Sequence, residues 1–342
     1  MKKNTIYNLL SSVIPMSIGI IAVPFLIKKM GIESFGVLSI IWTFIGYFSI
    51  FDFGIGRALT QQVSHLKEER EKMISVIKLG LLLMLITGII GGVLLALFVS
   101  LLDISWLKIS KNLYEDTIFS LLIASIGIPL TTVTTGLKGV LEGFEDFYSV
   151  SLLKMFLGIL NFLFPIFIVY YFGNSLKYVV LSIVISRLLI MLLHIYPVLE
   201  FISIKEFYNE KMASKDDMKK TLSFGVWMTI SNIISPLMVN SDRFFISSVL
   251  GASFIAYYTV PFDIIIRLLV IPAALTTTLF PRFSFLFRND LTQLKKLYNK
   301  SLLIVLLSMG IVSIGLIIFS YLGLKLWINE NFAMQSWKIV CV

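Results

Sequence analysis

Long apolar runs recur along almost all of this 342-residue sequence, and they constrain its fold more than any other feature. A helix needs about 20 residues to cross the hydrocarbon core of a bilayer. Nine runs reach that length: Thr5 to Ile27, Gly36 to Gln61, Lys78 to Leu102, Thr117 to Lys138, Val150 to Phe172, Tyr178 to Leu199, Leu222 to Ser247, Phe254 to Phe280 and Ser301 to Leu324. A tenth begins at Ser336. Because a segment in lipid must satisfy its own backbone hydrogen bonds, these runs predict an all-α integral membrane protein with about nine to ten helices in this chain.

The composition agrees with that class. The chain is 57% hydrophobic and 14% charged, whereas soluble domains average roughly 45–50% apolar and 25% charged residues. The net charge of +9 comes largely from short loops between apolar runs, so we expect no nucleic-acid partner. Cys341 is the single cysteine, which excludes an intrachain disulfide and a cysteine-based metal cluster.

The distribution of Lys and Arg predicts the orientation. If the N-terminus is cytoplasmic, the loops and flanking helix ends on the inner side hold nineteen basic residues and those on the outer side hold six. Cytoplasmic loops carry the excess of Lys and Arg in membrane proteins. The sequence therefore predicts a cytoplasmic N-terminus.

A weak internal repeat predicts two lobes. Shifting the chain by 220 residues places Phe25 on Phe245 and Gly31 on Gly251, and the order of helix, short outer turn, long helix and basic inner loop recurs. This order is expected of parallel repeats about an axis along the membrane normal. We expect a six-helix lobe over 1–199, a cytoplasmic linker over 200–220 and an incomplete second lobe over 221–342, with about a hundred further residues needed for two equal halves.

Four charged residues lie inside two of the apolar runs: Asp242, Arg243, Asp263 and Arg267. An ionisable residue at the centre of a spanning helix costs roughly 2.5–3.5 kcal/mol, so it usually faces the bundle interior or a watery cavity. A polar transport path is the default hypothesis. The alternatives are that Asp263 and Arg267 neutralise each other within one helix, and that Asp242 and Arg243 reach the headgroups by snorkelling.

Two other spans carry charged groups. Asp52 could carry an ion or proton, or it could bond neighbouring backbone while Arg57 reaches lipid phosphates. Arg187 lies about ten residues from either end of its span and shares a helix face with His194. A structural hydrogen-bonding role and a ligand role are both open for Arg187.

Signatures of enzymes and nucleotide-driven pumps are missing from the sequence. It contains no GxxxxGK[ST] phosphate loop, no HExxH and no GxSxG. We expect no catalytic residues, no metal and no cofactor, and any driving energy must come from an ion gradient, the membrane potential or the substrate's own gradient.

Two groups of residues resemble a known family. The first group is Asn8, Pro15, Pro24, the run from Lys29 to Gly36, the run from Phe51 to Gly54, and Arg57. The second is the run from Asn240 to Ile246, then Leu250, Gly251, Tyr257 and Tyr258. Together they resemble the bacterial polysaccharide flippases, relatives of the multidrug and toxin extrusion transporters and the lipid II flippases. The resemblance implies two six-helix lobes that face a central cavity.

The resemblance also implies a substrate. Members of this family move an undecaprenyl-pyrophosphate-linked oligosaccharide across the bacterial plasma membrane, by alternating access. Arg187, Arg243 and Arg267 are then the expected headgroup ligands, because cations inside a lobed cavity can pair with pyrophosphate. The carboxylates expected to balance these cations or bind a coupling ion are Asp52, Asp242 and Asp263. Membrane lipids, a glycan polymerase and glycosyltransferases are the implied partners.

Two other functions compete with this one. A multidrug or cation antiporter of the same superfamily should favour a carboxylate-rich, aromatic-lined cavity, and the deep arginines argue against it. An integral-membrane glycan polymerase or acyltransferase should carry a large outer loop with catalytic Arg or His, and the predicted outer loops are short.

Overall fold

A computed structural model describes residues 2–47, 51–101, 104–213, 238, 240–269, 272, 279, 286 and 290–341. The described residues are helical throughout, apart from short turns, and include no strand. The chain divides into two compact units, 1–255 and 256–342. Because 214–237 lie outside the described residues, the division predicted at the 200–220 linker stays a prediction.

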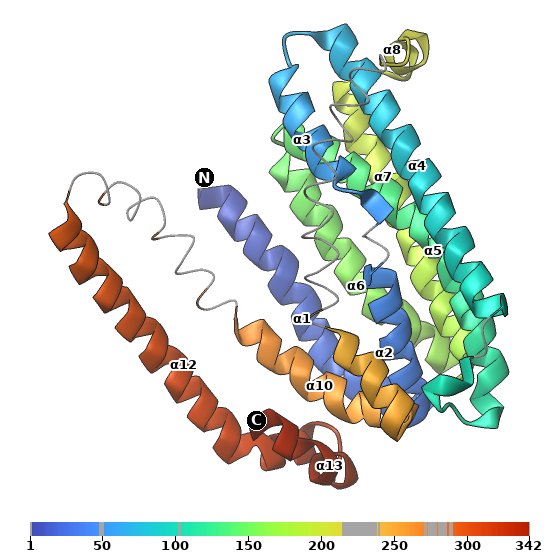
Figure 1. Ribbon diagram of the computed structural model, residues 1–342, viewed down its shortest axis with the longest axis vertical. Coiled ribbons are helices and arrows are strands. Elements are labelled where there is room, and N and C mark those ends of the chain that lie inside the picture. Colours follow the sequence, from blue (N-terminus) through green and yellow to red (C-terminus); the bar gives the residue numbers. More distant parts are fainter. Residues whose placement is uncertain are drawn as a thin grey trace. The chain divides into compact units, whose positions relative to one another are not determined.

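The first unit is a bundle of long helices (Figure 1). Its elements are α1 (Lys2–Met30), α2 (Ile32–Tyr47), α3 (Ile55–His65), α4 (Arg70–Leu101), the short 3-10 helix η2 (Ile104–Leu107), α5 (Lys111–Gly143), α6 (Phe147–Tyr171), α7 (Leu176–Phe201) and α8 (Ile204–Asn209), followed by a helix over 240–250. α5 packs along α4 and α7, and α1 packs along α6. Helix α10 (Ala252–Leu268) begins at the end of this unit.

The second unit contains most of α10 together with α12 (Leu291–Trp327) and α13 (Glu330–Cys341). Within it α12 packs against α13, and the Tyr257 and Phe332 rings contact each other with centroids 5.0 Å apart. The last helix begins at Glu330, six residues before the start that the sequence predicted.

Six helices of the described residues are long and apolar enough to cross a membrane: α1 over Leu10–Met30, α4, α5, α6, α7 and α12. They match six of the predicted runs and confirm an all-α, multi-pass membrane protein. The seventh predicted span lies largely outside the described residues, whereas the eighth is described over 254–269 and at 272 and 279.

The predicted span from Gly36 to Gln61 is wrong as a single helix. It is divided into α2 and α3, with a turn over 51–54. The Asp52 side chain accepts a hydrogen bond from the Gly54 amide at 2.7 Å, and Phe53 and Gly54 both have positive φ, 46° and 68°. A short carboxylate that bonds the backbone two residues ahead competes with helix formation, and apolar hydropathy gives no warning of it.

The predicted repeat has a local counterpart in the backbone. Gly31 (φ 87°) and Gly251 (φ 101°) each form a one-residue turn between two helices, and each amide donates to the carbonyl four residues earlier. The helices that follow begin at Ile32 and Ala252, which are 220 residues apart. A positive φ is readily adopted only by glycine, so both turns depend on that residue.

The core of the first unit gathers at the end where α3, α4, α5 and α7 meet. It includes the buried side chains Ile55, Leu59, Ile77, Val140 and Val198. α3 and α5 approach so closely that a Cβ at Gly139 would overlap the Gly56 carbonyl oxygen. A hydrophobic core with small residues at helix crossings is typical of membrane bundles.

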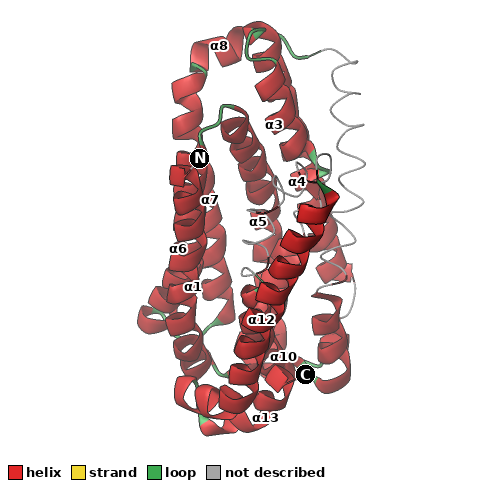
Figure 2. Ribbon diagram, turned by 90° about the vertical axis from the view of Figure 1, so that its left-hand side faces the viewer, coloured by secondary structure: helices red, strands yellow, loops and turns green. Residues whose placement is uncertain are grey.

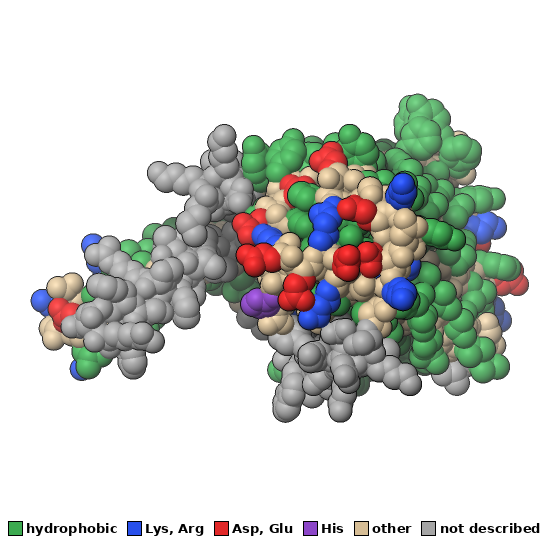
Figure 3. All heavy atoms as spheres, turned by 90° about the horizontal axis from the view of Figure 1, so that it is seen from above, with side chains coloured by type: hydrophobic (Ala, Val, Ile, Leu, Met, Phe, Trp, Pro, Cys, Tyr) green, Lys and Arg blue, Asp and Glu red, His purple; other side chains and the backbone are tan. Residues whose placement is uncertain are grey.

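Charged side chains cover the same end of the first unit (Figure 3). Lys67 pairs with Glu145 at 2.8 Å, Arg70 with Glu206 at 2.9 Å and Lys72 with Glu69 at 3.2 Å. These residues belong to the loops and helix ends that the charge distribution predicts to be cytoplasmic.

Candidate functional site

Three threonines place hydroxyl oxygens on one face of α5. Thr131, Thr134 and Thr135 follow the i, i+3, i+4 spacing that brings side chains together on a helix. Each hydroxyl donates to a carbonyl of the preceding turn, of Gly127, Leu130 and Thr131 respectively, at 2.7, 2.6 and 3.0 Å. Because their hydrogens are used in this way, the oxygens remain as acceptors, and this face of α5 suits neighbouring cations.

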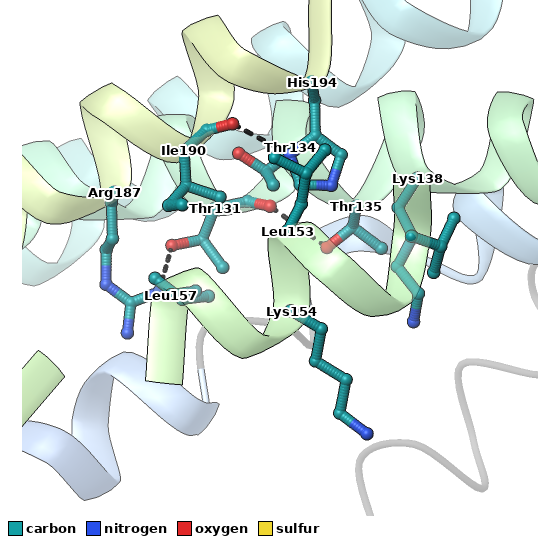
Figure 4. A pocket seen from close by; sticks show the side chains of 11 residues that line it. Thr131, Thr134, Thr135, Lys138, Leu153, Lys154, Leu157, Arg187, Ile190 and His194 are labelled. Carbon is teal, nitrogen blue, oxygen red and sulfur yellow. Dashed lines mark hydrogen bonds between the residues drawn. The ribbon is translucent and has the colours of Figure 1, made fainter. Parts of the chain in front are cut away.

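Arg187 of α7 contacts this face of α5. Its Nη1 donates to Thr131 Oγ1 at 2.9 Å (Figure 4). Its Nε is buried and has no hydrogen-bond partner among the described residues. A buried donor without a partner is costly, so a ligand that accepts from Nε would gain binding free energy.

Arg187 lines a pocket of about 220 Å³ between α5, α6 and α7. Its walls are Thr131, Thr134, Thr135, Lys138, Val150, Leu153, Lys154, Leu157, Arg187, Ile190 and His194. The lining contains three cationic side chains and a histidine but no carboxylate. The volume is below the roughly 300–1,000 Å³ of drug-sized ligand pockets, so it suits a compact anion such as a phosphate group.

The two lysines of the pocket contact partners on different helices. Lys138 pairs with Glu142 one turn along α5 at 3.4 Å, whereas Lys154 Nζ donates to Ser12 Oγ of α1 at 3.1 Å. Lys138 and Lys154 are both exposed, so their side chains can adjust to a ligand. Lys138 and Lys154 lie nearer than Arg187 to the end predicted to be cytoplasmic, so the pocket offers a series of cations from that end inward.

His194 completes the wall one turn from Ile190. Its Nδ1 lies 2.8 Å from the Ile190 carbonyl oxygen, and since a carbonyl only accepts, Nδ1 carries the hydrogen in this contact. The predicted shared face of Arg187 and His194 is confirmed, because both residues line the pocket.

Arg243, the second predicted headgroup ligand, is placed differently. It is only 8% exposed, and its Nη1 donates to Thr43 Oγ1 of α2 at 3.0 Å. The same helical segment is fixed by Ser247 Oγ, which donates to the Leu107 carbonyl at 2.7 Å. Arg243 is therefore held inside a helix contact, and the alternative that it snorkels to the headgroups does not apply in this structure. It is not part of the pocket lining.

The remaining predicted residues occupy three separate places. Asp52 bonds the Gly54 amide, and Asp242 accepts from the Arg243 amide at 2.8 Å, so both carboxylates bond nearby backbone. Asp263 and Arg267 lie on α10 in the second unit, where Asp263 is half-buried and Arg267 is exposed. The ion pairs of the described residues do not include one between them.

Sequence reasoning missed the residues that surround Arg187. Lys138 and Lys154 were interpreted only as basic helix ends, and the threonines were not singled out. A signal was present, because TTVTTG over 131–136 places three hydroxyls on one face of an apolar span. Among the residues that the structure describes, no group of His, Cys, Asp and Glu is arranged to hold a metal ion.

The described bundle has the fold of a known class of membrane transporters. An inward-facing structure of a multidrug resistance MATE family transporter of the MOP superfamily matches with a TM-score of 0.75 and 16% identity, over 98% of this chain and 79% of that chain. An outward-facing structure of such a transporter matches with a TM-score of 0.66 and 17% identity, over 100% and 78%. At these identities the likeness establishes the fold alone.

Sequence comparison identifies the family. Residues 1–287 match the family described as "Polysaccharide biosynthesis protein". A Shigella flexneri protein named "Putative O-antigen transporter" is 32% identical over 341 residues, which cover 99% of this chain and 79% of that protein. A Salmonella typhi protein of the same name is 25% identical over 293 residues, 80% of this chain and 62% of that protein. The chain belongs to the polysaccharide biosynthesis protein family, and the resemblance found in its motifs is confirmed.

Proposed function

We propose that this protein is a transporter that flips an undecaprenyl-pyrophosphate-linked oligosaccharide from the inner to the outer leaflet of a bacterial plasma membrane. The observation that carries the proposal is the pocket of Arg187, Lys138 and Lys154, which has cations and no carboxylate in its lining. The family and the O-antigen transporter names of two relatives support the same substrate class.

The chemistry of the pocket fits the headgroup. A pyrophosphate cannot enter hydrocarbon unaided, because removing an ion from water into a low dielectric costs several kcal/mol even after relaxation. Charge-assisted hydrogen bonds from a guanidinium and two ammonium groups can replace the lost hydration. The pocket has room for the phosphate groups, while the polyprenyl tail stays in lipid and the sugars occupy a wider space.

Arg187 and Arg267 remain proposed headgroup ligands, with Lys138 and Lys154 added to them. Arg243, held against Thr43, is proposed to stabilise the helix contact instead. Asp52, Asp242 and Asp263 remain proposed as charge-balancing or coupling-ion groups. The described contacts favour Arg187 most, since its side chain lines the pocket and its Nε is buried without a partner among the described residues.

The proposed orientation has the N-terminus in the cytoplasm, because the loops and helix ends on that side hold nineteen basic residues against six on the other. A single cysteine placed at Lys205 in a Cys341→Ser background should react with an impermeant maleimide from the cytoplasmic side only. Labelling from outside intact cells would show that the orientation is opposite to the one proposed.

The competing multidrug antiporter shares the fold but needs a different pocket. A cationic drug is repelled by Arg187, Lys138 and Lys154, and the residues that line the pocket include no carboxylate to attract it. The polymerase alternative is disfavoured by membership of a family whose two compared relatives are named transporters.

The function is tested in cells whose own copy of this protein is deleted. Lipid-linked oligosaccharide should accumulate on the inner leaflet, and restoring the protein should return it to the outer leaflet. Efflux of a cationic dye should be the same in both strains. Normal outer-leaflet oligosaccharide together with lost dye efflux would overturn the proposal in favour of the antiporter.

A further inference from the structure

A short helix follows the last span of the first unit and lies across the bundle. α8 is seen nearly end-on in Figure 1 and runs across the top of the bundle in Figure 2, so its axis is transverse to that of α4. Ser203 caps its N-terminus, accepting from the Glu206 amide at 3.2 Å, while Glu206 accepts from the Ser203 amide at 3.0 Å. A helix of six residues is not stable alone, so contacts with other elements must hold it.

Arg70, the first residue of α4, fixes the start of α8. Its Nε and Nη2 donate to the two carboxylate oxygens of Glu206 at 2.9 and 3.0 Å, and Nη2 also donates to the Phe201 carbonyl at 2.9 Å. This is the two-pronged geometry in which arginine binds a carboxylate most firmly.

Lys78, two turns further along α4, fixes the end of α8. Its Nζ donates to the carbonyls of Glu210 at 3.0 Å and Tyr208 at 3.3 Å, and it lies 5.7 Å above the Phe207 ring. Arg70 and Lys78 are about 12 Å apart along α4 at 1.5 Å per residue. α8 therefore lies beside the stretch of α4 where the charged helix end gives way to the apolar span.

The opposite face of α8 is apolar and exposed. Ile204 is 69% exposed and Tyr208 is 82% exposed, and their spacing of four residues places them on one side of the helix. Met212, just beyond the helix, is also exposed. Lys205 and Lys211 flank this face and are exposed. Apolar residues beside lysines, on a helix parallel to the membrane plane, fit the boundary between headgroups and acyl chains.

We propose that the segment 204–212, the interfacial segment, binds the anionic lipid surface of the cytoplasmic leaflet. Ile204, Tyr208 and Met212 enter the boundary of the acyl chains, and Lys205 and Lys211 pair with lipid phosphates. Since Arg70 and Lys78 hold α8 to α4, the lipid contact fixes the start of the 200–220 linker at the membrane surface. The proposal concerns a surface distant from the Arg187 pocket and does not depend on which substrate is carried.

The test measures depth in the membrane by electron paramagnetic resonance. Single cysteines at Ile204, Tyr208 and Asn209, each in a Cys341→Ser background, carry a nitroxide label in the protein reconstituted into vesicles of phosphatidylglycerol and phosphatidylcholine. Labels at 204 and 208 should be relaxed mainly by oxygen, which concentrates in lipid. The control at Asn209, which lies about 100° around α8 from Tyr208, should be relaxed mainly by a water-soluble nickel complex.

The lysines are tested on the same labels. Replacing Lys205 and Lys211 by Gln should move the label at 208 toward water in the anionic vesicles. The ratio of lipid-exposed to water-exposed label should fall about fivefold for each lysine. Vesicles of phosphatidylcholine alone should abolish the difference between the variants. Equal access of the nickel complex to 204, 208 and 209 in anionic vesicles would overturn the proposal. Burial of 204 and 208 in cells but not in vesicles would also overturn it, because that result would indicate a protein partner. Because no step of the assay involves flipping, a failed lipid contact is distinguishable from a failed transport function.

Discussion

Arg187 and Arg243 are both interior arginines that bond a threonine of a neighbouring helix, yet their surroundings differ. Arg243 is 8% exposed and bonds Thr43, in a helical segment that Ser247 also ties to the Leu107 carbonyl. Arg187 is half-buried, bonds Thr131 and opens onto a pocket with two further cations. An arginine inside a helix contact stabilises the fold, whereas one beside a cationic pocket is available to an anion. Variants of the two arginines should therefore show their defects in different assays, transport for Arg187 and stability for Arg243.

Replacing Arg187 should give the largest effect on transport. Arg187→Gln removes two or more charge-assisted hydrogen bonds, each worth about 1.5–3 kcal/mol, so we expect flipping to fall about a hundredfold or more at normal membrane abundance. Arg187→Lys keeps the charge but lacks the planar fork, so flipping by this variant should fall about tenfold. The measurement is lipid-linked oligosaccharide on the inner leaflet, normalised to protein level.

The matched control for Arg187 is Lys295→Gln, an exposed cation of α12. It should leave flipping nearly unaltered. Normal flipping by Arg187→Gln at normal abundance would remove Arg187 as a headgroup ligand and leave the Thr131 bond as its whole role.

Replacing Arg243 should affect stability first. Arg243→Gln should lower the free energy of unfolding in mixed detergent by about 1.5–3 kcal/mol, the range for a hydrogen bond to a charged group. Thr43→Val should produce a similar loss, and the double variant should show that the two losses are not additive. A hundredfold fall in flipping with unchanged stability would instead place Arg243 beside Arg187 as a ligand.

Arg267 tests whether an exposed arginine of the second unit belongs with the pocket cations. We expect Arg267→Gln to reduce flipping about tenfold, since it removes one charge-assisted contact. If Arg267 acts as a ligand, adding Asp263→Asn should not restore transport, because removing a carboxylate does not replace the lost contact with the headgroup. Recovery of both folding and transport in the double variant would support the ion-pair alternative.

Thr131 should act as a positioning residue for Arg187. Thr131→Val removes the acceptor for Nη1 and should reduce flipping by about threefold to tenfold, because Arg187 keeps its charge and loses only part of the roughly 1.5–3 kcal/mol of a hydrogen bond to a charged group. Thr131→Ser keeps the oxygen and should restore most of the activity. Equal loss in both variants would show that side-chain packing, and not the bond to Arg187, is what matters.

The smallest effect is a pH dependence at α8, far from either arginine. The bond from Arg70, with help from Ser203, holds the pKa of the Glu206 carboxyl at about 2, below its ordinary value of 4.5. A lowered carboxyl pKa stabilises the contact above pH 4.5 and loses that contribution as the pH falls toward 2. A nitroxide label at Asn209 should gain mobility over that range and stay unchanged from pH 5 to 8. Arg70→Gln should make it mobile throughout, and a label that loosens near pH 7 would contradict this cause.

The sequence predicted the spans better than their interruptions. Spans α4, α5, α6 and α7 were found from hydropathy because lipid imposes length and apolarity on each helix separately. The turn at Asp52 was missed because it depends on one side-chain bond to the Gly54 amide inside an apolar run. The one-residue turns at Gly31 and Gly251 were found by comparing two distant parts of the chain, which reveals a repeated backbone conformation.

The sequence by itself determined the class of this protein: an all-α membrane chain with charged residues inside its spans and the motifs of the polysaccharide flippases. Only the tertiary structure decided which side chains of other helices lie beside those charges. Spacing along one helix could place Arg187 and His194 on a common face, but Lys138 and Lys154 join them from α5 and α6. The physical reason is that hydropathy is a property of one segment in lipid, whereas a binding pocket depends on which side chains of separate helices face the same space.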